Sequence, residues 1–148
     1  MFYVIHIFPD RVLVTNRVED YVDLVIHVPP KGELLATFTT FIDAYMYARD
    51  IADRFGWVLE WYFGWAVLEY IKEGRVDRVL VTSKLEDMIE CHRLGIEKCK
   101  EHSYHLSFLD AYLTGRDLAD LWGAVLEWYL EDEAHLILET TMSRPVSP

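Results

Sequence analysis

A tandem repeat constrains this chain more than any other feature of its sequence. The stretch FIDAYMYARDIADRFGWVLEWY, residues 41–62, matches FLDAYLTGRDLADLWGAVLEWY, residues 108–129, at 14 of 22 positions. The same offset of 67 residues aligns DRVLVTNRVED, which begins at Asp10, with DRVLVTSKLED, which begins at Asp77, and no gap is needed. A repeat of this length is a supersecondary unit or a small domain. The two halves are therefore predicted to fold alike.

The repeat also predicts the domain organisation. A chain of 148 residues is long enough for one ordinary core, or for two small units that share a core. We expect a first repeat over 1–66 and a second over 67–140, packed about a pseudo-two-fold axis into one compact domain. The end of the chain, 141–148, is predicted to be a flexible tail.

Each half contains an amphipathic helix with clear ends. Apolar residues recur at helical spacing over 41–55 and over the copy, 108–122. Thr40 is placed to cap the start of the first helix and Gly56 to end it, and the copy has Ser and Gly at these two places. The sequence thus predicts two matching helices with the same bounds in each repeat.

Strands surround this helix in each half. WVLEWYF, residues 57–63, alternates between two faces and is followed by Gly64 and a second strand, WAVLEYIKEG. The segments FYVIHIF near the start and HLILETT near the end resemble that second strand. Each unit therefore reads as strand, strand, variable segment, helix, strand. Helices on one face of an antiparallel sheet define an α+β fold.

The halves diverge in one segment, residues 17–32 against 84–99. In the second half, SKLEDMIECHRLG predicts a helix that starts after Ser83 and ends at Gly95. In the first half, the β-branched residues over 22–28 favour a strand. Two interpretations stay open: the halves share one structure here, or they differ.

A cysteine–histidine cluster in the second half is the one chemically suggestive group. Cys91, Cys99, His102 and His105 lie within fifteen residues of one another, and thiolate with imidazole is the ligand set that zinc prefers. The spacing lacks the short Cys-x2–4-Cys pair of a standard zinc finger. A Cys91–Cys99 disulfide is an alternative, because intracellular disulfides occur in hyperthermophiles. The default interpretation is two unrelated buried cysteines and surface histidines.

The sequence contains no phosphate-binding loop, nucleophile elbow, HExxH motif or dinucleotide fingerprint. Two hypotheses remain: a non-enzymatic protein that binds a partner protein or itself, and a zinc-binding domain or metal-dependent enzyme built on the cysteine–histidine cluster. Tryptophan and tyrosine are enriched in interface hot spots, so the aromatic strands are the predicted contact surface. Its residues are Val58, Glu60, Tyr62, Trp65 and Tyr129. The alternative is that aromatic residues of these strands, such as Trp61 and Trp128, belong to the core.

The net charge and the amino-acid composition limit the classes of binding partner and the kind of source organism that we expect. The net charge of −11 disfavours nucleic acid, whose phosphates are bound by clustered Lys and Arg. No stretch approaches the roughly 18 apolar residues of a membrane span, and the start of the chain lacks the features of a signal peptide. We therefore expect a soluble, cytoplasmic protein. The chain has no Gln, and Asn16 is its only Asn, a scarcity of thermolabile amides that indicates a thermophilic source.

Overall fold

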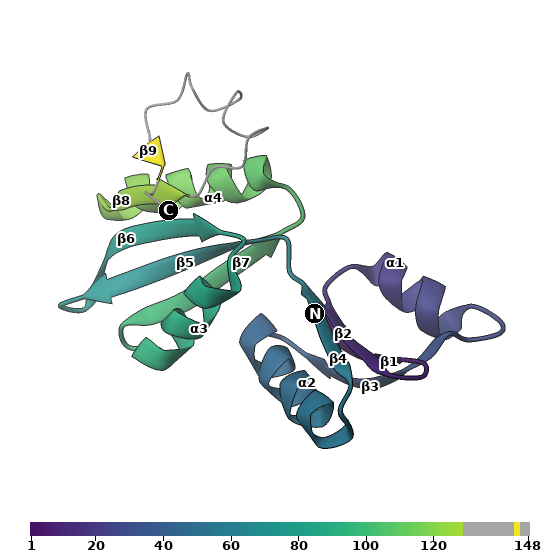
Figure 1. The fold of residues 1–148 in the computed structure, drawn as a ribbon. Helices are drawn as coiled ribbons and strands as arrows, with labels where there is room; N and C mark the ends of the chain where they lie inside the picture. Colours follow the sequence, from purple (N-terminus) through teal and green to yellow (C-terminus); the bar gives the residue numbers. More distant parts are fainter. Residues whose placement is uncertain (129–143, 146–148) are drawn as a thin grey trace. The chain divides into compact units, whose positions relative to one another are not determined.

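The computed structural model describes residues 1–128 and 144–145, and the chain divides into two compact units (Figure 1). Unit 1 is Met1–Phe63 and unit 2 is Gly64–Pro148. The division falls just before the predicted boundary of the repeats, because Gly64 takes a left-handed conformation with φ of 68° and Trp65 already begins a strand of unit 2. The shared domain and the pseudo-two-fold axis remain predictions.

The two units have the same order of elements. Unit 1 contains β1 (Phe2–Ile7), β2 (Arg11–Thr15), α1 (Val18–Tyr21), the π-helix η1 (Val22–Ile26), β3 (Gly32–Phe38), α2 (Phe41–Phe55) and β4 (Val58–Tyr62). Unit 2 contains β5 (Trp65–Lys72), β6 (Arg75–Thr82), α3 (Leu85–Leu94), β7 (Cys99–His105), α4 (Phe108–Trp122) and β8 (Val125–Trp128), followed by β9 (Arg144–Pro145). This matching order confirms the predicted α+β class with two similar units. The predicted strand HLILETT lies outside the described residues, and β9 falls within the predicted tail.

Both sheets are mixed, which the sequence did not predict. The strand order is β3-β1-β2-β4 in unit 1 and β7-β5-β6-β8-β9 in unit 2. In unit 1, β1 pairs antiparallel with β2 and β3, but β4 pairs parallel with β2. The reason is that α2 carries the chain from the edge strand β3 across the sheet to the opposite edge, where β4 runs in the same direction as β3. Unit 2 repeats this arrangement with α4, β6 and β8.

The predicted helices α2 and α4 each cover one face of their sheet, and a second helical segment lies on the other. In β1, the neighbours Phe2 and Tyr3 point to opposite faces. Phe2 packs edge-on against Phe41 of α2, with ring centroids 5.6 Å apart, whereas Tyr3 stacks on Tyr21 of α1 at 5.1 Å. In unit 2, α4 contacts β6 and α3 contacts β7. Helical segments therefore contact strands of both sheets in addition to α2 and α4, which agrees with strands that are apolar on both faces.

The helix bounds predicted from the repeat are confirmed. α2 spans Phe41–Phe55 and α4 spans Phe108–Trp122, and Gly56 and Gly123 follow them with φ of 70° and 65°. Only the second helix has the predicted cap, in which Ser107 Oγ accepts a hydrogen bond from the backbone N–H of Asp110 at 3.2 Å.

A threonine–aspartate pair starts the helical segment after the second strand of each unit. Thr15 Oγ1 donates to Asp20 Oδ2 at 2.6 Å and accepts from the backbone N–H of Arg17 at 3.1 Å. Thr82 and Asp87 repeat this contact at 2.5 Å. Burial raises the pKa of Asp87, and the hydrogen bond from Thr82 opposes that shift. The side chain of Lys84, the residue before α3, makes no capping hydrogen bond, so the helix start differs from the one at Ser83 that the sequence indicated.

The segment 22–28, whose β-branched residues favour a strand, contains no strand. Val22–Ile26 forms a π-helix, closed by a hydrogen bond from the N–H of His27 to the carbonyl of Val22 at 3.0 Å. The capping pair sets the helical start, and this outweighs the strand propensity of the β-branched residues. Residues 17–32 and 84–99 therefore share one plan, a helical segment that leads into an edge strand.

Gly115 allows α4 to approach its sheet closely. This close approach predicts that adding one methyl group at residue 115 destabilises the fold. A Cβ at this position would lie 2.8 Å from Val81 Cγ2 and 3.1 Å from Leu126 Cδ1. Gly115→Ala should lower the free energy of unfolding by about 1–3 kcal/mol, although alanine is the better helix former. Chemical denaturation followed by circular dichroism measures this change. The exposed Asp117→Ala is the control, expected to stay within about 0.5 kcal/mol of the parent. An unchanged or stabilised Gly115→Ala protein contradicts the close packing.

Candidate interaction surface at the edge of the first sheet

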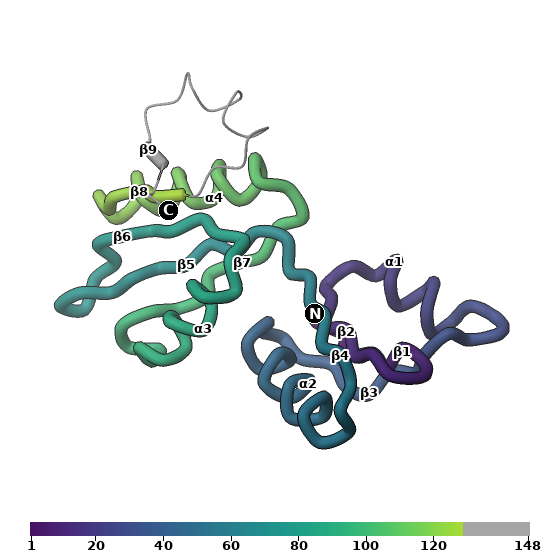
Figure 2. Tube along the Cα trace, in the orientation of Figure 1, coloured from purple at the N-terminus to yellow at the C-terminus, as the bar shows by residue number. Residues whose placement is uncertain are grey.

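β4 forms an open edge of the unit 1 sheet. It pairs with β2 along one side in unbroken register, from Arg11 opposite Val58 to Thr15 opposite Tyr62. Figure 2 traces the path of the two strands. Within the described part of the chain, no strand pairs with its other side. The opposite edge strand, β3, has an irregular register against β1. Such irregularity disfavours the pairing of a further strand, whereas a regular edge strand accepts one.

The backbone of β4 presents hydrogen-bonding groups to this open edge. The N–H of Val58 points inward, because it donates to the carbonyl of Asp10 at 2.9 Å. Backbone groups of successive residues in a strand point to alternate sides within the sheet. The N–H and C=O groups of Leu59 and Trp61 therefore point away from β2.

Large apolar side chains flank these backbone groups. Val58 is 57% exposed and Trp61 is 42% exposed. Trp61 lies on the α2 face of the sheet, where its ring meets that of Tyr45 edge-on with centroids 5.8 Å apart. The sequence placed Val58 on the predicted contact surface and left Trp61 open between that surface and the core. The alternating pattern alone could not show that this edge lacks a neighbour.

The other two predicted surface residues on β4 are held by charged partners. Arg11 donates to Glu60 at 3.0 Å, and both side chains remain partly exposed. The guanidinium of Arg17 lies over the ring of Tyr62, 4.2 Å from its centroid. These contacts orient Glu60 and Tyr62 on the α1 face, although ion pairs this exposed add little stability.

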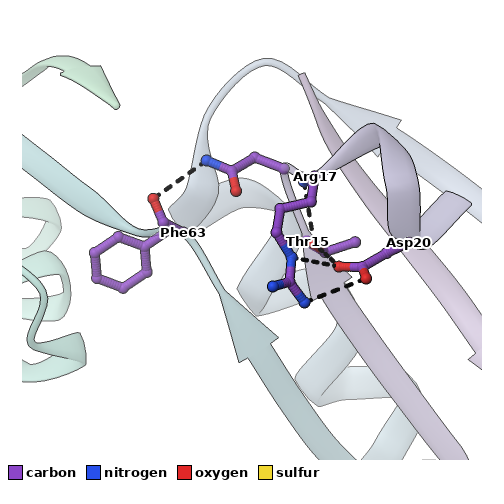
Figure 3. Close-up of polar contacts among 5 residues, drawn as sticks. Thr15, Arg17, Asp20 and Phe63 are labelled. Carbon is purple, nitrogen blue, oxygen red and sulfur yellow. Dashed lines mark hydrogen bonds and ion pairs between the residues drawn. The ribbon is translucent and has the colours of Figure 1, made fainter. Parts of the chain in front are cut away.

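A polar network fixes the end of β4. Arg17 donates to the two carboxylate oxygens of Asp20 at 3.0 and 3.2 Å, and these hydrogen bonds raise the pKa of Arg17. Figure 3 shows this pair with Thr15 and with Phe63, whose carbonyl accepts from Asn16 Nδ2 at 3.2 Å. The only Asn of the chain therefore ties the residue after β4 to the loop before α1. The open edge is thus positioned by a defined set of bonds.

The matching edge in unit 2 is covered. β8 begins with the same residues as β4, VLEW, and pairs in parallel with β9. The register places Arg144 opposite Glu127 and Pro145 opposite Trp128. Trp128, the counterpart of Trp61, is only 1% exposed. Among the strands that the structure describes, one strand sequence therefore forms a bare edge in one unit and an interior strand in the other.

Two of the predicted surface residues do not belong to this edge. Trp65 is a core residue of unit 2, where its ring packs edge-on against Phe108 at 4.7 Å. Its prediction as a surface residue was wrong because the strand after Gly64 is buried on both faces. Tyr129 lies outside the described residues.

The structure joins Cys91 and Cys99 in a disulfide between α3 and the start of β7, with an S–S distance of 2.07 Å. The two histidines are linked through Ser103, whose Oγ lies 3.0 Å from His102 Nδ1 and 2.9 Å from His105 Nε2. Burial lowers the pKa of His105. Among the described residues, no three His, Cys, Asp or Glu side chains are grouped as metal ligands. Because the disulfide occupies both sulfurs, the zinc hypothesis now concerns the reduced chain.

Comparison of the sequence and the structure with protein-family models, curated proteins and solved structures gave no match. In the described ranges, no helix has both the length and the apolar character that a membrane crossing requires.

The different burial of the two equivalent tryptophans predicts different effects on stability. Trp128→Ala should lower the free energy of unfolding by about 3–5 kcal/mol, because it removes a fully buried indole. Trp61→Ala should cost about 1 kcal/mol, since much of its ring already contacts water. Denaturant titrations of the two variants make the comparison. Equal losses would show that Trp61 is a core residue after all.

The disulfide predicts a stability difference that depends on redox conditions. The bond closes a short loop, with a sequence separation of 8, and such loops contribute about 2–3 kcal/mol. The double variant Cys91→Ser, Cys99→Ser should unfold at correspondingly lower denaturant concentration, and dithiothreitol should shift the parent protein but not the variant. Adding Co²⁺ to the reduced parent tests the zinc hypothesis, because cobalt–thiolate bonds absorb visible light. A colourless reduced protein would count against that hypothesis.

Proposed function

We propose that this protein is a non-enzymatic protein-interaction module that binds an extended segment of a partner protein at the β4 edge. The observation that carries this proposal is the contrast between two equal strands. β8 is paired on both sides, whereas β4 offers the same residues with one side bare among the described residues. Strand addition to an open edge is a common way to bind peptides.

The chemistry of the edge supports this mode of binding. The outward N–H and C=O groups of Leu59 and Trp61 supply a short hydrogen-bonding ladder, which is not specific for side chains. Trp61 supplies a large, partly exposed ring beside the ladder, and tryptophan is one of the residue types enriched in binding hot spots. The network of Arg17 and Asn16 holds the strand in place before binding, so less conformational entropy is lost when a partner adds to it.

Charge supports a protein partner over a nucleic acid. The net charge of −11 repels phosphates, whereas it attracts basic protein segments and speeds their encounter.

The proposed cytoplasmic location and thermophilic source depend on each other. Disulfides are rare in the cytoplasm of mesophiles but occur in intracellular proteins of hyperthermophiles. The Cys91–Cys99 bond and the scarcity of amide side chains are compatible with both proposals together. A thermal midpoint above about 90 °C would support the source, and a midpoint in the mesophilic range would count against it.

A matched pair of variants tests the edge. Peptides selected from a displayed random library against the full chain should lose at least about tenfold in affinity, or about 1.4 kcal/mol, for Val58→Lys. Lysine on an edge strand opposes further pairing, and Val58 is exposed, so the fold should tolerate it. Val125→Lys is the control, because this residue is equally exposed, at 54%, on a strand that is already paired. Equal loss in both variants, or in neither, would overturn the proposal.

A further inference from the structure

The second unit indicates what kind of segment suits the β4 edge, and this inference rests on the proposed function. We infer that β4 binds an extended segment that runs parallel to it and carries a basic residue followed by proline. The basic residue would lie opposite Glu60 and the proline opposite Trp61. The occupant is a segment of another protein with this chemistry.

The register of β9 is the first argument. β4 and β8 share the residues VLEW, so both edges offer a glutamate followed by a tryptophan. At β8, the segment that completes the sheet is parallel, with Arg144 opposite Glu127 and Pro145 opposite Trp128. Within unit 2, Glu127 also pairs with Arg78 at 3.2 Å, as Glu60 pairs with Arg11. Paired residues on neighbouring strands carry their side chains on the same face of the sheet, so a cation at the paired position is attracted to the carboxylate. The same pairing transferred to β4 puts a cation beside Glu60.

The state of Glu60 is the second argument. Its side chain is 43% exposed, compared with 18% for Glu127 in the completed sheet. Arg11 contacts only Oε1 of Glu60, and an ionised carboxylate accepts several hydrogen bonds. A glutamate in the middle of an edge strand also opposes pairing of β4 with itself in a symmetric dimer, because two such strands in antiparallel register about Glu60 would oppose like charges.

The proline fits the geometry of the edge. In a pair of parallel strands, consider a residue whose N–H and C=O face the neighbouring strand. It does not bond to the residue directly opposite, but to the two residues that precede and follow that one. Trp61 faces outward, so the residue opposite it turns its own N–H away from β4. Proline, which has no N–H, can take that place without loss of a ladder bond. Its ring is apolar and lies at the level of the exposed indole.

The number of available segments argues against a second copy as the occupant. Each chain has two VLEW strands but one described Arg-Pro segment, which its own β8 already binds. If that segment moved to β4 of another copy, one edge would be filled and another left bare. Exchange between copies therefore gains no strand pairing.

The experiment uses the full chain and a synthetic peptide, TMSRPVSP, that copies residues 141–148. The peptide should bind the parent protein in calorimetry and shift the backbone amide signals of residues 58–62 in NMR spectra. A peptide with Arg144→Glu should bind at least about tenfold more weakly, and the protein variant Glu60→Arg should reverse this preference. Circular dichroism checks that Glu60→Arg remains folded, because the change replaces the exposed ion pair with Arg11 by two exposed like charges.

Three results would overturn the inference. The first is no binding of TMSRPVSP, or binding that ignores the charge exchange. The second is amide shifts confined to residues 125–128, which would show replacement of β9. The third is self-association in sedimentation experiments that Val58→Lys abolishes, which would make a second copy the occupant. If library peptides still depend on Val58, the proposed binding edge stands and only the Arg-Pro preference fails.

Discussion

The burial of α2 against its sheet decides where the last strand of unit 1 lies. Phe41 of α2 packs on Phe2 of β1, and the helix must cross the sheet to keep this apolar face covered. The chain consequently leaves β3 at one edge and returns at the other, where β4 pairs in parallel with β2. The open edge, the outward Trp61 backbone and the placement of Glu60 all depend on this crossover.

The sequence predicted those elements whose signals are local. Helical spacing and glycine stops gave the bounds of α2 and α4, and alternation located most of the strands. It also predicted two similar units, because the repeat is itself a sequence pattern. The parallel pairing of β4 could not be predicted from the residues near it. It depends on which strand lies beside β4 after the chain has crossed the sheet. The π-helix at Val22–Ile26 was missed because the Thr15–Asp20 cap acts across five positions, while the β-branched residues after it favour a strand.

The candidate site was only partly accessible from sequence. Alternation placed Val58, Glu60 and Tyr62 together on one face of their strand, but Trp61 and Trp128 have the same sequence neighbours and different exposure. Trp128 packs in the core of unit 2, on a strand that also pairs with the distant β9, whereas Trp61 lies on an edge strand. The cysteines posed the same difficulty. Their spacing allowed a disulfide, a metal site or no relation, and only the approach of α3 to β7 distinguishes a disulfide, with Cα atoms 5.2 Å apart.

The structure of each sheet edge determines how many edges of the molecule can accept a further strand. β3 and β7 both pair irregularly with their neighbours, and β9 ends in a proline that cannot donate to a further strand. Of the edges in the described residues, β4 alone is regular and bare. A molecule with a single edge that accepts a strand can pair with the end of another sheet. It then offers no second edge to which a further strand could add. Under the proposed binding mode, such a protein would bind an exposed strand without starting a fibre.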